Sequence, residues 1–380
     1  MSPGEAEFIP VFYARCCPHD DDISSQPDLA TKAAHLLCHH TASILESHVR
    51  PAFVAQGTHP ALDRRRSRKG DVKPDLSFYD KQPWKERKQG EDWDAVDVLR
   101  WCVCETEKPD IDALLPLLVP PILTIIDDWD VRYKTTGITL LRHILRQTDP
   151  ALLAKMGLGD VFLEAVSTCL TYVNDPDLHI PLLRESFPCI LELIHALYPT
   201  GSEKYVTLYE RVLVDGVLNG LKFAGDKLVF RQVLVEQVES VYEGLGAVGV
   251  RYLKYIIPML CETLETPFLV SPITTRSGSL SLQATAARTL GCVIAGCWPR
   301  IPRYRGVILR ALAMAWRRTV ARIRARREEV ADAETEALRK LLKKDCELLR
   351  EACGVEIEPD FAALRALDQP VFGVLLPTTS

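Results

Sequence analysis

Apolar residues recur every three or four positions from Trp93 to about residue 352, and this helical period constrains the fold more than any other feature of the chain. The predicted helices come in pairs that are separated by short acidic turns. The aspartates of three successive turns, Asp128, Asp175 and Asp226, are 47 and 51 residues apart. A helix–turn–helix unit at this interval predicts an all-α fold, a HEAT-like helical-repeat solenoid (α-α superhelix), in which each pair buries its apolar face against its neighbours.

The helical pattern is interrupted, and the interruptions divide the chain into five regions. In chain order, the predicted regions are a loosely ordered N-terminal arm at 1–27, an N-terminal helix at 28–55, a polar and partly disordered loop at 56–92, about five HEAT-like helix pairs at 93–355 with an insert at 266–278, and a C-terminal tail at 356–380. The loop is rich in glycine, proline and charge and has few aliphatic residues, which is the composition of a segment that cannot bury a core.

The composition is that of an ordinary soluble protein, with 47% apolar and 26% charged residues and a net charge of −5 among 380 residues. The N-terminus lacks the basic flank and apolar stretch of a signal peptide. The longest apolar run, at 114–126, contains three prolines and is too short for a membrane span. We therefore expect an intracellular protein with no membrane contact, in which the twelve cysteines are reduced thiols.

Two groups of cysteine and histidine could in principle supply zinc ligands. They are CCPH (Cys16, Cys17, His19) and CHH (Cys38, His39, His40). Their spacing fits no standard zinc module, and the second group falls on a predicted helix. We therefore favour ordinary thiols over zinc ligands, and we expect no metal site and no cofactor.

The stretch GLGAVG at 244–249 has the letters of a dinucleotide-binding fingerprint. That fingerprint requires a strand before it and a helix that opens at it. The residues before it instead have a helical period, so GLGAVG is predicted to be a turn between repeats. A cofactor enzyme that uses GLGAVG stays as an alternative, and it predicts strands at 228–243. The other common catalytic motifs are absent from the sequence, which favours a protein that is not an enzyme.

Ten arginines and no acidic residue occur between Arg300 and Arg327. In the helix predicted there, the inward face consists of Ile308, Leu312, Ala315, Trp316, Thr319 and Ile323. Arg310, Arg317 and Arg324 are seven residues apart and line the opposite side, with Arg318 beside them. Two interpretations stay open: a solvated face, or a docking strip for an acidic partner, since arginine forms bidentate hydrogen bonds with carboxylates. Nucleic acid is a third and unlikely partner, because the strip lacks interleaved aromatic residues and the whole chain is acidic.

One segment resembles a known family. LPLLVPPILTIIDDWDVRYKTTGITLLRHIL at 115–145 is similar to the signature of the Tel-two-interacting-protein-two family, in which an apolar, proline-containing helix leads to Asp-Asp, an aromatic residue and then Arg-x-Lys-x-x-Gly. The matching residues are Asp127, Asp128, Trp129, Arg132, Lys134 and Gly137. Upstream, DKQPWKE at 80–86 and VDVLRWCV at 96–103 resemble the Pro-Trp-Lys segment of the family and the helix that follows it.

The resemblance implies a non-catalytic subunit of the TTT co-chaperone complex, which contains Tel-two and Tti-one subunits. Such a subunit binds Tti-one, and the complex works with the ninety-kilodalton heat-shock chaperone to mature phosphatidylinositol 3-kinase-related kinases. It acts in the cytoplasm and nucleus and takes no small-molecule substrate. The alternative is a generic HEAT-repeat adaptor with a different client.

Within the signature we expect most residues to be structural. Asp127, Asp128 and Arg132 are predicted to cap the second helix and to bridge adjacent repeats. Trp129, at the tip of the turn, is the candidate for partner contact, although a tryptophan in this place could equally cover its own repeat. The arginine strip is the other candidate, and the sequence does not decide which surface binds the partner.

Overall fold

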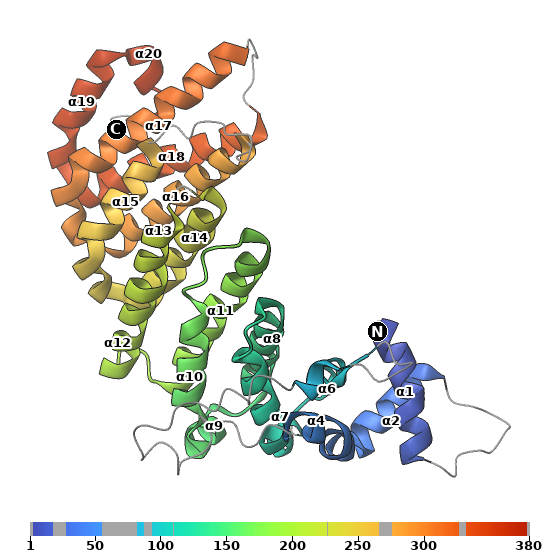
Figure 1. Cartoon of the computed structure of the whole chain (residues 1–380). Coiled ribbons are helices and arrows are strands. Elements are labelled where there is room, and N and C mark those ends of the chain that lie inside the picture. Colours follow the sequence, from blue (N-terminus) through green and yellow to red (C-terminus); the bar gives the residue numbers. More distant parts are fainter. Residues whose placement is uncertain are drawn as a thin grey trace. The chain divides into compact units, whose positions relative to one another are not determined.

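The computed structural model describes residues 3–17, 28–54, 82–86, 93–108, 110–225, 227–265, 276–326 and 332–377. No strand occurs in these ranges, and helices make up most of them, so the predicted all-α fold is confirmed (Figure 1). Asp226, His19, most of the predicted loop at 56–92 and residues 266–275 of the predicted insert lie outside the described residues. None of the helices in the described ranges is both long and apolar enough to cross a bilayer.

The chain folds into two compact units, one comprising Met1–Cys169 with Pro181–Leu197 and the other Leu170–Ile180 with Tyr198–Ser380. The helices of the first unit are α1 (Pro3–Cys16), α2 (Leu29–His39), α3 (Thr41–Ile44), η1 (a π-helix, Leu45–Val49), α4 (Arg50–Val54), η4 (a 3₁₀ helix, Pro83–Lys85), α6 (Ala95–Glu105), α7 (Asp110–Ile126), α8 (Val131–Gln147), α9 (Pro150–Met156), α10 (Leu158–Cys169) and the second part of α11 (Pro176–Leu197).

The second unit continues the helical order. Its remaining helices are α12 (Glu203–Arg211), η5 (a π-helix, Val212–Leu218), α13 (Asn219–Ala224), α14 (Leu228–Leu245), η6 (a 3₁₀ helix, Gly246–Tyr252), α15 (Leu253–Glu265), α16 (Arg276–Gly296), η7 (a 3₁₀ helix, Trp298–Tyr304), α17 (Arg305–Arg326), α18 (Ala333–Cys353), η8 (a 3₁₀ helix, Gly354–Ile357), α19 (Glu358–Leu367) and α20 (Gln369–Phe372).

Three successive helix pairs of the second unit have the same layout, in which a 3₁₀ helix joins two α-helices. The pairs are α14 with α15, α16 with α17, and α18 with α19. Helix α16 packs between α14 and α18, and α15 packs against α17, so equivalent helices stack in two layers (Figure 1). Each pair covers the apolar face of the next, which is the organisation of a helical repeat.

Helices α7 and α8 form a helix pair in the first unit, and their packing shows how the sequence encodes it. The apolar positions of α7 are buried almost completely, from Ile111 to Ile126. Arg142 of α8 donates to Glu185 and Glu192 of α11 at 2.9–3.1 Å, and so joins α8 to the next helix pair. The polar face of α8 thereby contacts its neighbour through ion pairs while its apolar face packs on α7.

The glycines of GLGAVG mark a helix end, but they lie within the α14–α15 pair, where η6 joins the two helices, and not in a turn between repeats as predicted. Helix α14 runs through the place where the cofactor-enzyme alternative requires strands, so that alternative is wrong on this point. Gly246 ends the helix with a positive φ of 53°, a backbone conformation that residues other than glycine rarely adopt. A Cβ on Gly244 would overlap the ring of Tyr209, so this glycine is needed for close packing.

Two predictions about the chain ends are wrong. Residues 3–16 of the supposed arm form α1, in which Phe8, Ile9 and Phe12 are buried. The ring of Phe8 lies 5.6 Å from that of Trp93 and 5.5 Å from that of Trp101. The sequence does not reveal this helix because its apolar face is short and because Trp93 and Trp101, two of its packing partners, lie more than 80 residues further along the chain.

The supposed C-terminal tail is also folded, because it contains α19 and α20. Phe361 of α19 is fully buried, and the indole Nε1 of Trp316 donates to the carbonyl oxygen of Val371 at 2.8 Å. These residues complete the last helix pair. The predicted single helix at 28–55 is likewise divided into α2, α3, η1 and α4.

Candidate functional site

The turn between α7 and α8 contains the family signature, and Asp130 is the residue that caps α8. The carboxylate of Asp130 accepts a hydrogen bond from the backbone N–H of Arg132 at 2.9 Å. The Arg132 guanidinium donates to the same carboxylate at 3.0 Å. Partial burial opposes ionisation of Asp130, but the hydrogen bonds from Arg132 outweigh it and hold the pKa of this carboxyl below its usual value. The cap that the sequence analysis expects from Asp127 or Asp128 is therefore provided by the next aspartate.

Asp128 joins this turn to a segment more than 40 residues earlier. Its buried carboxylate accepts hydrogen bonds from Lys85 Nζ at 2.7 Å, from Gln82 Nε2 at 2.9 Å and from the backbone N–H of Asp130 at 2.7 Å. Lys85 and Gln82 belong to the DKQPWKE segment. The two stretches that carry the family resemblance thus form one structure, which we call the signature junction: residues 82–86 together with 126–137.

The ammonium group of Lys85 lies among three aromatic rings as well as beside Asp128. Its Nζ is 4.6 Å from the ring centroid of Tyr133, 4.9 Å from that of Trp84 and 5.1 Å from that of Trp129. Each distance is within the range of a cation–π interaction. Trp84 is itself buried, whereas 74% of Trp129 is exposed. The junction therefore holds a large aromatic side chain at the surface on a buried ionic support.

The remaining signature residues bring α7 and α8 together. Lys134 is buried, and its Nζ donates to the carbonyl oxygen of Ile126 at 2.7 Å, at the C-terminal end of α7. A Cβ at Gly137 would lie 2.7 Å from Ile126 Cγ1 and 3.0 Å from the Ile126 backbone nitrogen, so only glycine allows this approach. Asp127 is exposed in the turn. The Arg-x-Lys-x-x-Gly pattern thus encodes a helix cap, a helix C-terminus contact and a close helix crossing.

Several arginines of the predicted strip form contacts within the protein and are therefore not free to bind a partner. Arg310 forms a bidentate pair with Glu265 of α15, at 2.7 and 2.9 Å, and Arg318 donates to the carbonyl oxygen of Leu264 at 3.0 Å. Arg305 pairs with Asp360 of α19 at 3.2 Å. Arg317 and Arg324 are exposed, and neither pairs with an acid of the described residues. These two residues, which we call the arginine face, are the exposed members of the four candidate contacts Arg310, Arg317, Arg318 and Arg324 that pair with no acid of the described residues.

The predicted inward side of α17 is observed at most of its positions. Ile308, Leu312, Ala315, Trp316 and Thr319 are buried, whereas Ile323 is only half-buried near the end of the helix. The ion pairs of the strip were not visible in the sequence because their acids come from α15 and α19, about 45–55 residues away. The sequence analysis did not identify Lys85 and Gln82 as site residues, although Lys85 is the lysine of the Pro-Trp-Lys motif and Gln82 directly precedes this motif.

Comparisons with known proteins agree with the signature. Residues 20–271 match the Tti2 family, a stretch that contains the whole signature junction and excludes the arginine face. TELO2-interacting protein 2 of mouse is 26% identical over 247 residues, which cover 64% of this chain and 44% of the mouse protein. The human protein of the same name is 24% identical over the same shares. The chain thus spans less than half the length of these relatives. The family is not a known family of enzymes, and a match over most of the sequence shows that the chain belongs to the Tti2 family.

Proposed function

We propose that this chain is a non-catalytic scaffold subunit of a TTT-type co-chaperone complex. In this proposal it binds a Tti-one subunit, assembles with Tel-two, and supports the chaperone-dependent maturation of phosphatidylinositol 3-kinase-related kinases. Membership of the Tti2 family supports the role of subunit, and the relatives are named for interaction with TELO2. Stacked helix pairs present extended surfaces, which suits a protein whose work is to bind other proteins.

The observation that carries the proposal is the exposed Trp129 of the signature junction. Tryptophan is enriched among the residues that dominate binding energy at protein interfaces. Lys85 and Asp128 hold the turn in one arrangement, so that little conformational freedom would be lost when a partner covers the ring. We propose that Trp129 contacts the partner, rather than only covering its own repeat.

The arginine face is the second proposed contact. Arg317 and Arg324 are one heptad apart on the exposed side of α17, a spacing that suits carboxylates along one side of a partner helix. Charges of this kind mainly raise the rate and specificity of association. They therefore supplement the contact at Trp129 in the proposal.

The test is to tag the chain, purify it from its own cells in mild salt and identify what comes with it. We expect Tel-two and Tti-one relatives in near-equal amounts, with the kinases at lower levels. Trp129→Ala should reduce their recovery on the order of 10-fold or more, because hot-spot residues contribute about 2 kcal/mol or more. Trp298→Ala is the matched control, since Trp298 is 60% exposed in the other unit.

Recovery of the chain alone, or with unrelated cargo, would contradict the proposal and favour a helical-repeat adaptor with a different client. Equal losses for Trp129→Ala and Trp298→Ala would reject Trp129 as the specific contact.

We also propose that the protein acts in the cytoplasm and nucleus, where its clients would be assembled. Fluorescence imaging of the tagged chain in living cells checks this, and confinement to another compartment would contradict it.

A further inference from the structure

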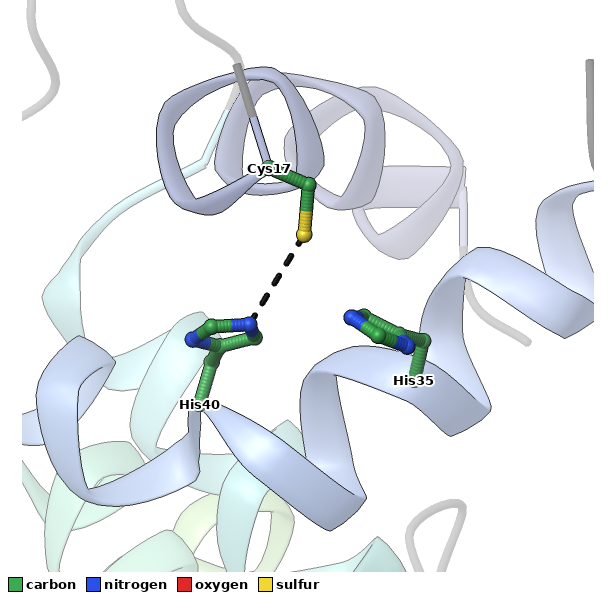
Figure 2. Close-up of side chains that lie close together, drawn as sticks. All are labelled: Cys17, His35 and His40. Carbon is green, nitrogen blue, oxygen red and sulfur yellow. Dashed lines mark hydrogen bonds between the residues drawn. The ribbon is translucent and has the colours of Figure 1, made fainter. Parts of the chain in front are cut away.

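Three side chains that could bind a metal ion meet where α1 and α2 end. Cys17 directly follows α1, His35 lies on α2, and His40 is the residue that caps the C-terminus of α2 (Figure 2). Cys17 Sγ is 3.7 Å from His40 Nε2, and one ligand atom from each of the three residues lies within 4.8 Å of the others. All three side chains are half-buried, so an ion from solvent can reach them. The structure thus brings Cys17 and His40, one from each of the two groups that the sequence analysis considered as zinc ligands, together with His35, which belongs to neither group.

The distances fit a tetrahedral zinc ion. With Zn–S of about 2.3 Å and Zn–N of about 2.0–2.1 Å, a tetrahedral angle places the sulfur and nitrogen atoms about 3.5–3.6 Å apart. The observed separation of 3.7 Å between Cys17 Sγ and His40 Nε2 is close to this value. The ring centroids of His35 and His40 are 5.5 Å apart, and both rings face the sulfur (Figure 2). All three ligand atoms already lie within 4.8 Å of one another, and the proposed site requires side-chain movement that brings them to zinc-bonding distance.

The surrounding helices hold two of the ligands in place. The backbone N–H of His40 donates to the carbonyl oxygen of Leu36, which fixes the end of α2. The ring of His35 packs edge-on against Tyr13 of α1, with centroids 5.8 Å apart. These contacts hold the imidazoles near Cys17 whether or not an ion is bound, and such a pre-arranged ligand set loses less entropy on binding.

The electrostatics at the C-terminal end of α1 favour a cation. Cys17 follows the C-terminal end of α1, where the unpaired carbonyl groups carry partial negative charge, whereas His40 both ends α2 and precedes the N-terminus of α3, so that the charges of these two helix ends oppose each other. The negative end of α1 favours a positive ion beside the Cys17 sulfur. A divalent metal supplies the charge that allows the thiolate to form.

We propose that Cys17, His35 and His40 bind one Zn²⁺ ion, with water in the fourth position, and that the ion fastens α1 to α2. A mixed set of thiolate and imidazole ligands suits Zn²⁺ and is a poor match for Mg²⁺ or Ca²⁺, which prefer oxygen. Binding converts the Cys17 thiol to a zinc-bound thiolate and releases one proton to solvent. No electron is transferred in this step.

A second group of potential ligands in the described residues, Glu239, Glu243 and Cys292, is a weaker candidate. Burial raises the pKa of the Cys292 thiol, and the two neighbouring carboxylates raise it further. Two carboxylates and one thiol are also less selective for zinc than two imidazoles and one thiol. We therefore place the proposed zinc ion at Cys17, His35 and His40 and not at this second group.

The first test is a Co²⁺ titration of the full-length, reduced and chelator-treated protein, because Co²⁺ reports thiolate ligation through its near-ultraviolet absorption. We expect saturation at one equivalent and displacement of the Co²⁺ by Zn²⁺. Cys17→Ser should abolish the thiolate band, and His35→Gln or His40→Gln should weaken binding about 10-fold or more. Cys38→Ser is the matched control, since Cys38 is exposed on the same helix between the two histidines. Absence of the band, or its equal loss in Cys38→Ser, would overturn the proposal.

The second test needs no variant, so it is independent of any folding defect. The unsubstituted protein is alkylated with iodoacetamide, with and without one equivalent of Zn²⁺, and each cysteine peptide is quantified by mass spectrometry. Zinc should slow the alkylation of Cys17 about 10-fold or more and leave that of Cys38 unchanged. Equal rates at Cys17 with and without the metal would reject the site.

Discussion

At the scale of single residues, the best-defined feature of the signature junction is a buried carboxylate whose partners come from two directions. The side chain of Asp128 is 1% exposed and that of Lys85 is 17% exposed, so the charge of Asp128 is removed from water and depends on Lys85 for compensation. Gln82 and the backbone of Asp130 satisfy further lone pairs of the carboxylate. A buried pair of this kind is destabilised strongly when one partner is removed.

We predict that Lys85→Met destabilises the protein by roughly 3 kcal/mol, because it leaves the Asp128 carboxylate buried without a counter-ion. Urea unfolding of the purified chain measures the change. Lys155→Met is the control, since Lys155 is exposed at the end of α9. Similar midpoints for Lys85→Met and the unsubstituted protein would show that the ion pair contributes little.

Asp345 is a second buried carboxyl, and it forms no ion pair with the residues that the structure describes. It lies on α18 beside Gly291 of α16, and its Oδ2 has no hydrogen-bond partner within the described part of the chain. Burial raises the pKa of Asp345 well above the usual aspartate range, although the nearby Lys344 opposes the shift. The folded protein therefore retains a proton here that the unfolded chain loses at lower pH.

This shift predicts a pH dependence of stability. The contribution of protonated Asp345 is fully present below the ordinary pKa of aspartate and is lost as pH rises through the raised pKa. Asp345→Asn should therefore have a higher Tm than the unsubstituted protein at pH 8, by about 2–4 °C for each kcal/mol, and the difference should shrink toward pH 4.5. Differential scanning calorimetry across this range checks it, with the exposed Glu347→Gln on the same helix as control. A difference that does not change with pH would contradict the prediction.

At the scale of helices, the crossing of α7 and α8 depends on a missing side chain. Gly137 lies against Ile125 and Ile126 at a distance that leaves no room for a Cβ. Lys134, one turn earlier on α8, donates to the Ile126 carbonyl oxygen from the same face. The helix pair is thus joined at its turn by one polar contact and one close approach.

Gly137→Ala should destabilise the first unit by about 1–3 kcal/mol, because the added methyl group forces the two helices apart. Gly306→Ala is the matched control, since a Cβ there meets no atom within 4 Å. It should be neutral or stabilising by up to about 1 kcal/mol through helix propensity. Thermal unfolding followed by circular dichroism compares the two variants, and equal effects would show that the crossing is not tight.

At the scale of the whole molecule, a chain with a net charge of −5 carries a local cationic surface on α17. The packing of α17 divides its arginines into two classes. Arg310 and Arg318 serve the contact with α15, whereas Arg317 and Arg324 face solvent. Substitution of Arg310 or Arg318 should therefore change stability, whereas substitution of Arg317 or Arg324 should change partner binding.

We predict that the double variant Arg317→Glu/Arg324→Glu lowers partner recovery several-fold in low salt and leaves the Tm unchanged. High salt should narrow the difference from the unsubstituted protein, since exposed charges are screened. Arg310→Glu should instead lower the Tm, because it places a second carboxylate beside Glu265. If the double variant recovers its partners normally at all salt concentrations, Arg317 and Arg324 form a solvated face and do not bind a partner.

The sequence by itself determined the helical class, the helix end at GLGAVG and most of the inward side of α17. Each of these depends on residues within one or two helical turns of one another, so periodicity and glycine placement record them directly. Periodicity and glycine placement did not identify α1 and α19 as helices, because their short apolar faces are stabilised by distant partners such as Trp93 and Trp316.

Only the tertiary structure decided which charges are paired and which ligands meet. Lys85 reaches Asp128 across 43 residues, Arg310 reaches Glu265 across 45, and Cys17 reaches His40 across 23. Whether such distant residues meet depends on how whole helices pack. That packing is determined by the many side chains of each helix face together, so no single residue reveals it in the sequence. The sequence therefore names only some of the residues of the junction, the arginine face and the proposed zinc site, and helix packing decides which residues lie together.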